Sequence, residues 1–180
     1  MLARLGLDFV VASPDVDERR LPGEDAATYV RRLALAKTQT VGDTDAAVIA
    51  ADTAVVLDGE ILGKPVDEVD GREMIGRLAG RSHEVVTGVA VRLVADDSSL
   101  VEAESTIVHL AVVSAQRAGW YAASGEGADK AGGYALQGAA ALFADRVEGS
   151  VSSVIGLPLP LLDGLCTRLG IDLLSFRSPR

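Results

Sequence analysis

The stretch AAVIAADTAVVLDGEILGKP, residues 46–65, decides the fold class, because its first half has the composition of a buried strand. Residues 46–57 are almost all Ala, Val, Ile or Leu, as in a central strand that is covered on both faces. Asp52 interrupts this run, and a buried carboxylate costs on the order of several kcal/mol unless a partner pairs with it. Two roles are open for Asp52 on these residues alone. It could cap backbone amides at a kink of the strand, or it could act as a base or metal ligand in a cleft.

Strand-like and helix-like patterns alternate along the rest of the chain. The residues on both sides of DDSS, residues 96–99, are rich in β-branched side chains and indicate a hairpin. This alternation, with one hairpin, predicts an α/β fold with a mixed sheet. We expect strands over 8–12, 46–57, 84–95 and 100–113, and a further strand and turn within 141–150. We expect helices over 25–41, 66–80, 114–124 and 157–170.

The composition indicates one domain, residues 1–180, with an aliphatic core, because 48% of the residues are hydrophobic and only 4% are aromatic. The single cysteine, Cys166, builds no disulfide framework, which is typical of a reducing cytoplasm. No apolar run approaches the roughly 20 residues that span a bilayer, and the N-terminus lacks the pattern of a signal peptide. The formal net charge of −9 disfavours nucleic acid and anionic membranes as partners.

Two lysines occupy positions that suit an anionic ligand. Lys37 shares the apolar stripe of its predicted helix with Val30 and Leu33. It could extend its ammonium group to water from the helix edge, or it could bind an anion beside Asp52. Lys64 lies between a glycine and a proline, which is consistent with a surface turn or with a ligand contact. It is not a P-loop lysine, because GEILGKP is one residue short of that motif and ends in proline.

Two further segments could contribute to a phosphate site. DVDE, residues 15–18, places three carboxylates in a loop that is either a solvated acidic surface or part of a site for a hard cation such as Mg²⁺. GEGADKAGGYALQG, residues 125–138, is too rich in glycine for a regular element and contains Lys130 and Gln137. Such a loop could surround phosphate or admit a planar base, with Gln137 offering both a donor and an acceptor.

Other catalytic templates do not fit the chain. HEVV lacks the second histidine of the H-E-x-x-H zinc motif, and the sequence contains no G-x-S-x-G nucleophile motif. The two histidines are far apart and there is one cysteine, which argues against a histidine-based triad and against a zinc site.

Taken together, these motifs resemble the Maf-like nucleoside triphosphate pyrophosphatases. The resemblance rests on DVDE, ADT with DGEILGKP, LAGRSHEVVTGVAV, SGEGADKAGGYALQG and EGSVSSVIGLPL, which follow one another in the order and spacing of that family. It extends from residue 1 to about residue 165. The combination of ADT and GADKAGGYALQG is similar to the branch that acts on dTTP and UTP.

The resemblance implies an elongated mixed α/β fold with two lobes around a cleft, usually as a homodimer. It implies hydrolysis of dTTP or UTP to the monophosphate and pyrophosphate, with Mg²⁺ or Mn²⁺ as cofactor. Asp52 would accept a proton from the attacking water, and Glu18 and Asp52 would hold the metal. The residues that the resemblance places around the substrate are Lys37, Lys64 and Lys130 for the triphosphate, and Thr53 and Gln137 for base choice.

One departure from the family concerns its N-terminal motif. Family members begin with a strand and a loop of the form Leu-Ala-Ser-x-Ser-Pro-Arg-Arg, whereas the present sequence starts at Met1, within the helix that follows this loop. We therefore expect the first strand of the sheet to be missing, with two strand edges exposed. The departure also supports an alternative function, a catalytically impaired nucleotide-binding or regulatory protein of the septum-formation-inhibitor type.

Overall fold

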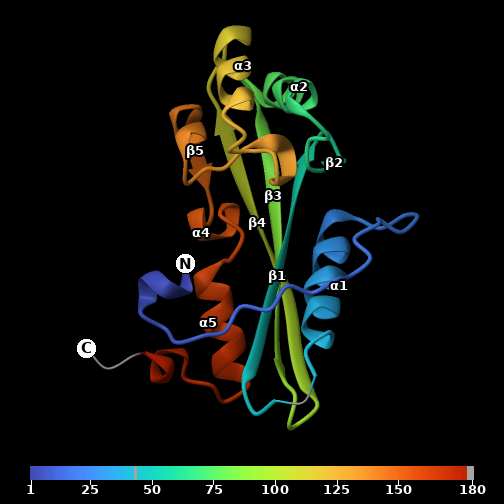
Figure 1. Ribbon diagram of the computed structural model, residues 1–180, viewed down its shortest axis with the longest axis vertical. Coiled ribbons are helices and arrows are strands. Elements are labelled where there is room, and N and C mark those ends of the chain that lie inside the picture. The colour runs from blue at the N-terminus through green and yellow to red at the C-terminus, as the bar shows by residue number, and fades with distance from the viewer. Residues whose placement is uncertain (43, 178–180) are drawn as a thin grey trace.

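The computed structural model describes residues 1–42 and 44–177, which form a five-stranded sheet with helices on both faces (Figure 1). The strands lie in the order β2-β1-β3-β4-β5, so the predicted α/β class is confirmed. The strands are β1 Ala47–Leu57, β2 Glu60–Leu62, β3 Ser82–Leu93, β4 Ser98–Leu110 and β5 Ala144–Glu148. The α-helices are α1 Ala26–Gln39, α2 Glu68–Leu78, α3 Ala115–Ala123, α4 Val151–Val154 and α5 Leu159–Arg168. The 3₁₀ turns are η1 Leu2–Leu5, η2 Ala131–Gly133, η3 Ala139–Leu142 and η4 Leu173–Phe176.

Every pairing between these strands is antiparallel, which corrects the expected mixed sheet. β1 and β2 are joined by Asp58 and Gly59, whose φ angles of 52° and 82° are typical of a type I′ hairpin turn. A short turn that ends at Asp97 joins β3 to β4. Tight turns can join only antiparallel neighbours, whereas parallel strands need a crossover of roughly a dozen residues or more. The short connections therefore set the direction of these strands.

The expected strand over residues 8–12 is not formed. Phe9, Val10 and Val11 are 50%, 96% and 77% exposed, although their side chains favour strands. A strand needs a neighbouring edge to pair with, and among the residues that the structure describes the only ladder contact of residues 7–12 is an isolated bridge between Leu7 and Arg177. Between Ala47 and Ala54 the outer edge of β1 likewise has no paired strand among residues 1–42 and 44–177.

Helix α1 packs closely on one face of the sheet, over β1 and β3. Asp25 caps its N-terminus by accepting a 2.7 Å hydrogen bond from the amide of Thr28. Gly88 on β3 permits the approach, because a Cβ atom there would lie only 2.5 Å from the carbonyl oxygen of Val30. This contact sets the height of α1, and hence of its side chains, above the sheet.

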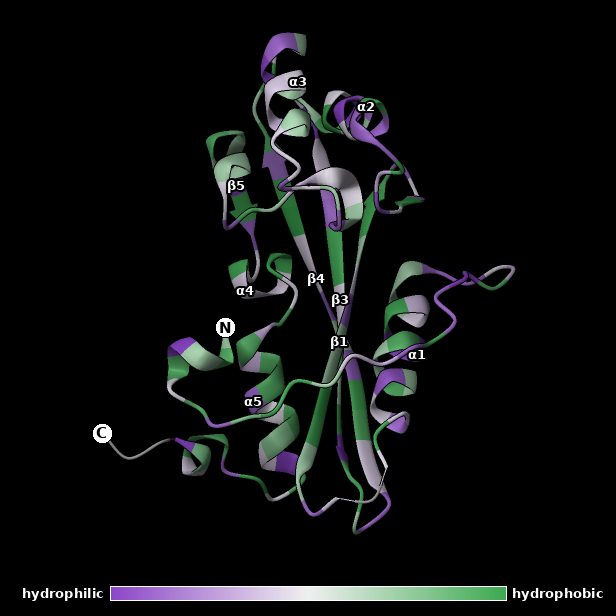
Figure 2. Cartoon of the chain, in the orientation of Figure 1, coloured by the Kyte–Doolittle hydropathy of each residue, from purple (hydrophilic) through white to green (hydrophobic). Residues whose placement is uncertain are grey.

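The opposite face of the sheet carries two hydrophobic clusters. One cluster lies under α2 and α3 at the upper end of the sheet, and the other lies under α5 at the lower end (Figures 1 and 2). Cys166 belongs to the lower cluster and is fully buried, as expected for a small hydrophobic residue. The long strands β1, β3 and β4 each extend from the upper end of the sheet to its lower end. Residues near the midpoints of these strands therefore lie between the two clusters. In the described part of the chain, no helix has the length and apolarity needed to cross a membrane.

Candidate active site

Asp52 lies at the middle of β1, opposite Gly88 on β3, and its side chain is 12% exposed. Its partner is Lys37 of helix α1, whose ammonium group donates a 2.6 Å hydrogen bond to Asp52 Oδ1. The same ammonium group lies 3.0 Å from Glu18 Oε1. Two carboxylates from distant parts of the sequence therefore converge on one lysine, which accounts for the carboxylate inside an apolar strand.

Burial and charge act in opposite directions on this cluster. Burial raises the pKa of the Asp52 carboxyl above its usual range, and the hydrogen bond and charge of Lys37 offset only part of that effect. Burial alone would lower the pKa of Lys37, but hydrogen bonds to Asp52 and Glu18 outweigh it and raise that pKa. The hydrogen bond from Lys37 lowers the pKa of Glu18. The cluster thus combines a fixed cation, an ionised Glu18 and a carboxyl with raised proton affinity, as a general base requires.

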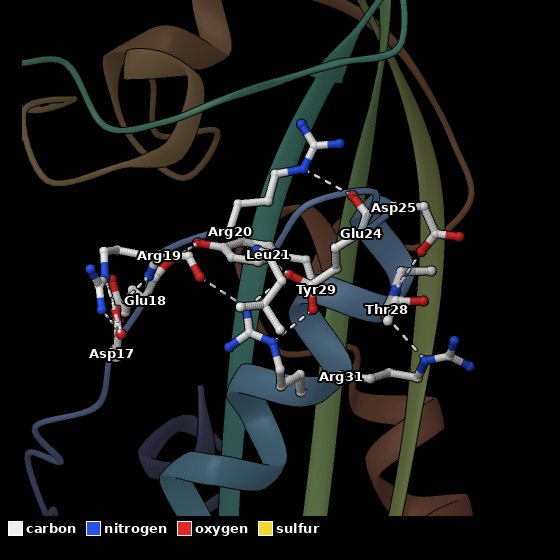
Figure 3. A network of polar contacts seen from close by, with 12 residues as sticks. Asp17, Glu18, Arg19, Arg20, Leu21, Glu24, Asp25, Thr28, Tyr29 and Arg31 are labelled. Atoms are coloured by element: carbon white, nitrogen blue, oxygen red, sulfur yellow. Dashed lines mark hydrogen bonds and ion pairs between the residues drawn. The ribbon is translucent and has the colours of Figure 1, made fainter.

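Glu18 is held in place by polar contacts to α1 (Figure 3). The hydroxyl of Tyr29 donates a 2.9 Å hydrogen bond to the carbonyl oxygen of Glu18. Arg32 donates to the carbonyl oxygen of Arg19 at 3.1 Å and to both carboxylate oxygens of the buried Glu24 at 2.7 and 2.8 Å. The C-terminal end of the DVDE loop is therefore fixed against α1. The loop is more than a solvated acidic surface.

Lys64 and the glycine-rich loop lie beside this cluster. Lys64 Nζ is 3.4 Å from Glu18 Oε2, and its positive charge also favours the carboxylate form of Asp52. The amide of Gly132 donates a 2.9 Å hydrogen bond to the carbonyl oxygen of Gly63, which joins the glycine-rich loop to the segment that carries Lys64. Basic and glycine-rich segments that are far apart in sequence are thereby brought together.

The remaining predicted residues do not contact the Asp52 cluster directly. Lys130 forms an ion pair with the adjacent Asp129 at 2.7 Å, and Gln137 is exposed on the glycine-rich loop. Thr53 points to the opposite face of β1 from Asp52, where its Oγ1 lies 2.9 Å from Thr87 Oγ1. The structure thus groups Glu18, Lys37, Asp52 and Lys64, and leaves the two residues expected for base choice on other surfaces.

Sequence reasoning missed several polar residues that support this arrangement. Thr87 is fully buried in EVVTGVAV and is a polar interruption of an apolar strand, which is the signal that identified Asp52. His83 and Tyr134 are both buried, and His83 Nε2 lies 2.7 Å from the Tyr134 hydroxyl, which ties the glycine-rich loop to β3. Burial lowers the pKa of His83 to about 4, so the ring is neutral at physiological pH. No pattern in the sequence indicated that these two residues meet.

A cavity of about 460 Å³ lies where the N-terminus of α1 meets the sheet. Its sheet side includes Val56, Val86 and Ala103, and its helix side includes Asp25 and Ala27. Its lining does not include Asp52 or Lys37, so the polar cluster lies outside this cavity.

The donor set at Asp52 suits a divalent cation that is shared with a substrate. Glu18 and Asp52 already converge on the single positive charge of Lys37. Within residues 1–42 and 44–177, no group of three or more His, Cys, Asp or Glu side chains could hold a metal alone. Mg²⁺ commonly takes only one or two carboxylates and completes its shell with phosphate oxygens and water. The residues present therefore fit a substrate-bound magnesium ion better than a permanent metal centre.

Comparison with known proteins gives a consistent result. A family model described as Maf-like protein matches residues 1–169. A dTTP/UTP pyrophosphatase from Symbiobacterium thermophilum is 44% identical over 177 residues, which cover 97% of this chain and 90% of the relative. Proteins with the same name from Anaeromyxobacter dehalogenans and Hahella chejuensis are 46% and 47% identical, and the matches cover 96% and 97% of this chain and 89% of each relative.

Proposed function

The chain belongs to the Maf-like protein family, and from this premise we propose that it is a nucleoside triphosphate pyrophosphatase that hydrolyses dTTP and UTP. The products would be the nucleoside monophosphate and pyrophosphate. Relatives named dTTP/UTP pyrophosphatase, 44% to 47% identical over at least 96% of this chain, support the substrate class. The observation that carries the proposal is the largely buried Asp52 carboxylate, hydrogen-bonded to Lys37 at 2.6 Å beside Glu18.

In this mechanism Asp52 is the general base. Burial raises the pKa of its carboxyl, so the carboxylate has more affinity for the proton of a water molecule than an exposed aspartate has. Lys37 holds the carboxylate in one position through its 2.6 Å hydrogen bond. Fixed geometry and neutralised charge are the main contributions that a protein makes to phosphoryl transfer.

The triphosphate would be bound by cations close to Asp52. We assign Lys37, Lys64 and Lys130 to its oxygens, since Lys64 already lies near Glu18 and the loop of Lys130 is joined to Gly63. Glu18 and Asp52 would hold Mg²⁺ or Mn²⁺, which when bound neutralises phosphate charge and orients the scissile group. Thr53 and Gln137 would contact the base.

We further propose that residues 1–180 act as one domain, since β1, β3 and β4 run through both hydrophobic clusters. The net charge of −9 disfavours nucleic acid as a ligand, whereas a small nucleotide would need only the local positive charges of the lysines near Asp52. A cytoplasmic location suits both the substrate class and the single buried cysteine. A homodimer is the expected assembly, by resemblance to the family.

The test is the identity of the products formed from UTP and dTTP in the presence of Mg²⁺. The proposal expects equal amounts of monophosphate and pyrophosphate, and no turnover once the metal is chelated. Release of UDP and orthophosphate would contradict it. Tight nucleotide binding without any turnover would instead support the regulatory alternative.

A further inference from the structure

Thr87 is a fully buried threonine in the middle of β3, and its hydroxyl has two close oxygen neighbours. Thr87 Oγ1 lies 2.9 Å from the carbonyl oxygen of Ser153 and 2.9 Å from Thr53 Oγ1. The three groups form a short chain that runs across the sheet from α4 to β1. Thr53 is the end of this hydrogen-bonded chain that is partly exposed.

The direction of the hydrogen bonds in this chain follows from the number of protons. A carbonyl oxygen can only accept, so the single hydroxyl proton of Thr87 is donated to Ser153. The contact between the two threonines then needs the proton of Thr53, which Thr87 accepts. The reverse arrangement would leave the oxygens of Thr87 and Ser153 at 2.9 Å with no proton between them, which is repulsive.

This direction fixes what Thr53 can offer to a ligand. Its proton is used internally, so its oxygen presents only lone pairs outward and recognises only a hydrogen-bond donor. Gly156 lies beside it without a side chain, and even a Cβ atom there would remain 3.5 Å from Thr53 Oγ1. The glycine-rich loop passes over Val55, the next residue of β1 on the same face, so the loop of Gln137 borders the same surface.

We propose that Thr53 accepts a hydrogen bond from the ring imide N–H of uracil and thymine, and that Thr87 is the positioning residue that makes Thr53 an obligate acceptor. Cytosine carries a lone pair at that ring position and would face the lone pairs of Thr53. The inference rests on the proposed function, because it specifies how that site separates UTP from CTP. Sites built for one hydrogen-bond pattern discriminate strongly because the wrong ligand leaves buried polar groups unpaired.

The test measures affinity rather than turnover, with non-hydrolysable α,β-methylene analogues of UTP, CTP and 3-methyl-UTP in the presence of Mg²⁺. The full chain should bind the UTP analogue about tenfold or more tighter than either of the others. Thr87→Val should reduce both preferences to about twofold, because Thr53 can then turn its proton outward. Thr87→Ser, which retains the hydroxyl, should keep both preferences at the level of the unaltered chain.

Thr106→Val is the matched control. Thr106 is also fully buried, lies on β4 and bonds Ser150 of the same α4 segment, but it does not contact Thr53. It should lower thermal stability and leave the preferences as they are. In Thr87→Val the carbonyl of Ser153 keeps its 2.8 Å bond from the amide of Gly156, so we expect this variant to fold.

Two results would overturn the inference. The first is equal affinity of the unaltered chain for the UTP and 3-methyl-UTP analogues, which requires no variant. The second is a Thr87→Val protein that keeps the full preference. Failure of the proposed function gives a different result, namely that the chain prefers the UTP analogue but releases no pyrophosphate from UTP.

Discussion

At the scale of the residue, Asp52 keeps a raised proton affinity although an ammonium group lies 2.6 Å from it. The cause is burial, which removes water from the charged form and outweighs the hydrogen bond and charge of Lys37. The nearby negative charge of Glu18 adds to the effect. Lys37 therefore does not hold Asp52 at the low pKa of a simple surface ion pair, and the carboxylate remains able to accept a proton.

Lys37→Met tests this balance, because it removes the cation and keeps an unbranched side chain. The hydrogen bond and the charge that favour the carboxylate would both be lost, so the pKa of Asp52 should rise further. The acid limb of the pH profile of kcat/KM reports deprotonation of the base in the free enzyme. It should move to higher pH by about one unit when UTP is the substrate.

Lys130→Met is the matched control for that profile. Lys130 forms its ion pair with Asp129, and the groups that act most on the pKa of Asp52 are Lys37, Glu18 and Lys64. The control should weaken turnover without moving the acid limb. An acid limb that stays in place in Lys37→Met would show that Asp52 is not the titrating base.

At the scale of the element, the site depends on how closely α1 packs against β3. Lys37 comes from the helix and Asp52 from the sheet, so their 2.6 Å contact requires the helix to lie at one height. Gly88 sets that height, since it brings the backbone of β3 directly under the carbonyl group of Val30. A residue with no side chain thus controls the geometry of a polar cluster.

Gly88→Ala should displace α1 and separate Lys37 from Asp52. The added Cβ atom would lie 2.5 Å from the oxygen of Val30 and 2.9 Å from the nitrogen of Arg31, and both are backbone atoms. Overpacking of this kind costs about 1–3 kcal/mol of unfolding free energy, and pyrophosphate release should fall with it. Urea unfolding and steady-state kinetics measure the two effects.

Gly76→Ala provides the comparison, because Gly76 is exposed on α2 and a Cβ atom there meets nothing within 4 Å. This substitution should raise the unfolding free energy by about 0.5–1 kcal/mol through the entropy of the unfolded chain. Similar stabilities for the two alanine variants would contradict the role given to Gly88.

At the scale of the whole molecule, the sequence predicted the elements better than their arrangement. The helix expected over 25–41 is α1, Ala26–Gln39, and the expected hairpin is β3 and β4, displaced by two or three residues. The mixed sheet was wrong, because strand direction depends on connections that hydropathy does not report. The strand over 8–12 was wrong, because a strand requires a partner edge as well as suitable residues.

The candidate site shows the same division. Asp52 stood out in the sequence as a charge inside an apolar run, and Lys37 and Lys64 stood out as lysines at positions that suit an anion. The family resemblance then gave Glu18 and the two lysines their roles around Asp52. The contacts of Tyr29 with Glu18, and of Thr87 with Thr53 and Ser153, join segments that are far apart and follow no periodicity. These contacts can be identified only in the three-dimensional structure.

The role of Asp52 as general base is tested by comparing pyrophosphate release from UTP by this chain and by Asp52→Asn, with Mg²⁺ present. Asparagine has nearly the same shape but cannot act as a base at neutral pH, and matching thermal unfolding would show that both proteins are folded. We expect the rate to fall by about 100-fold or more, the usual contribution of a general base. Equal rates for the two proteins would contradict it.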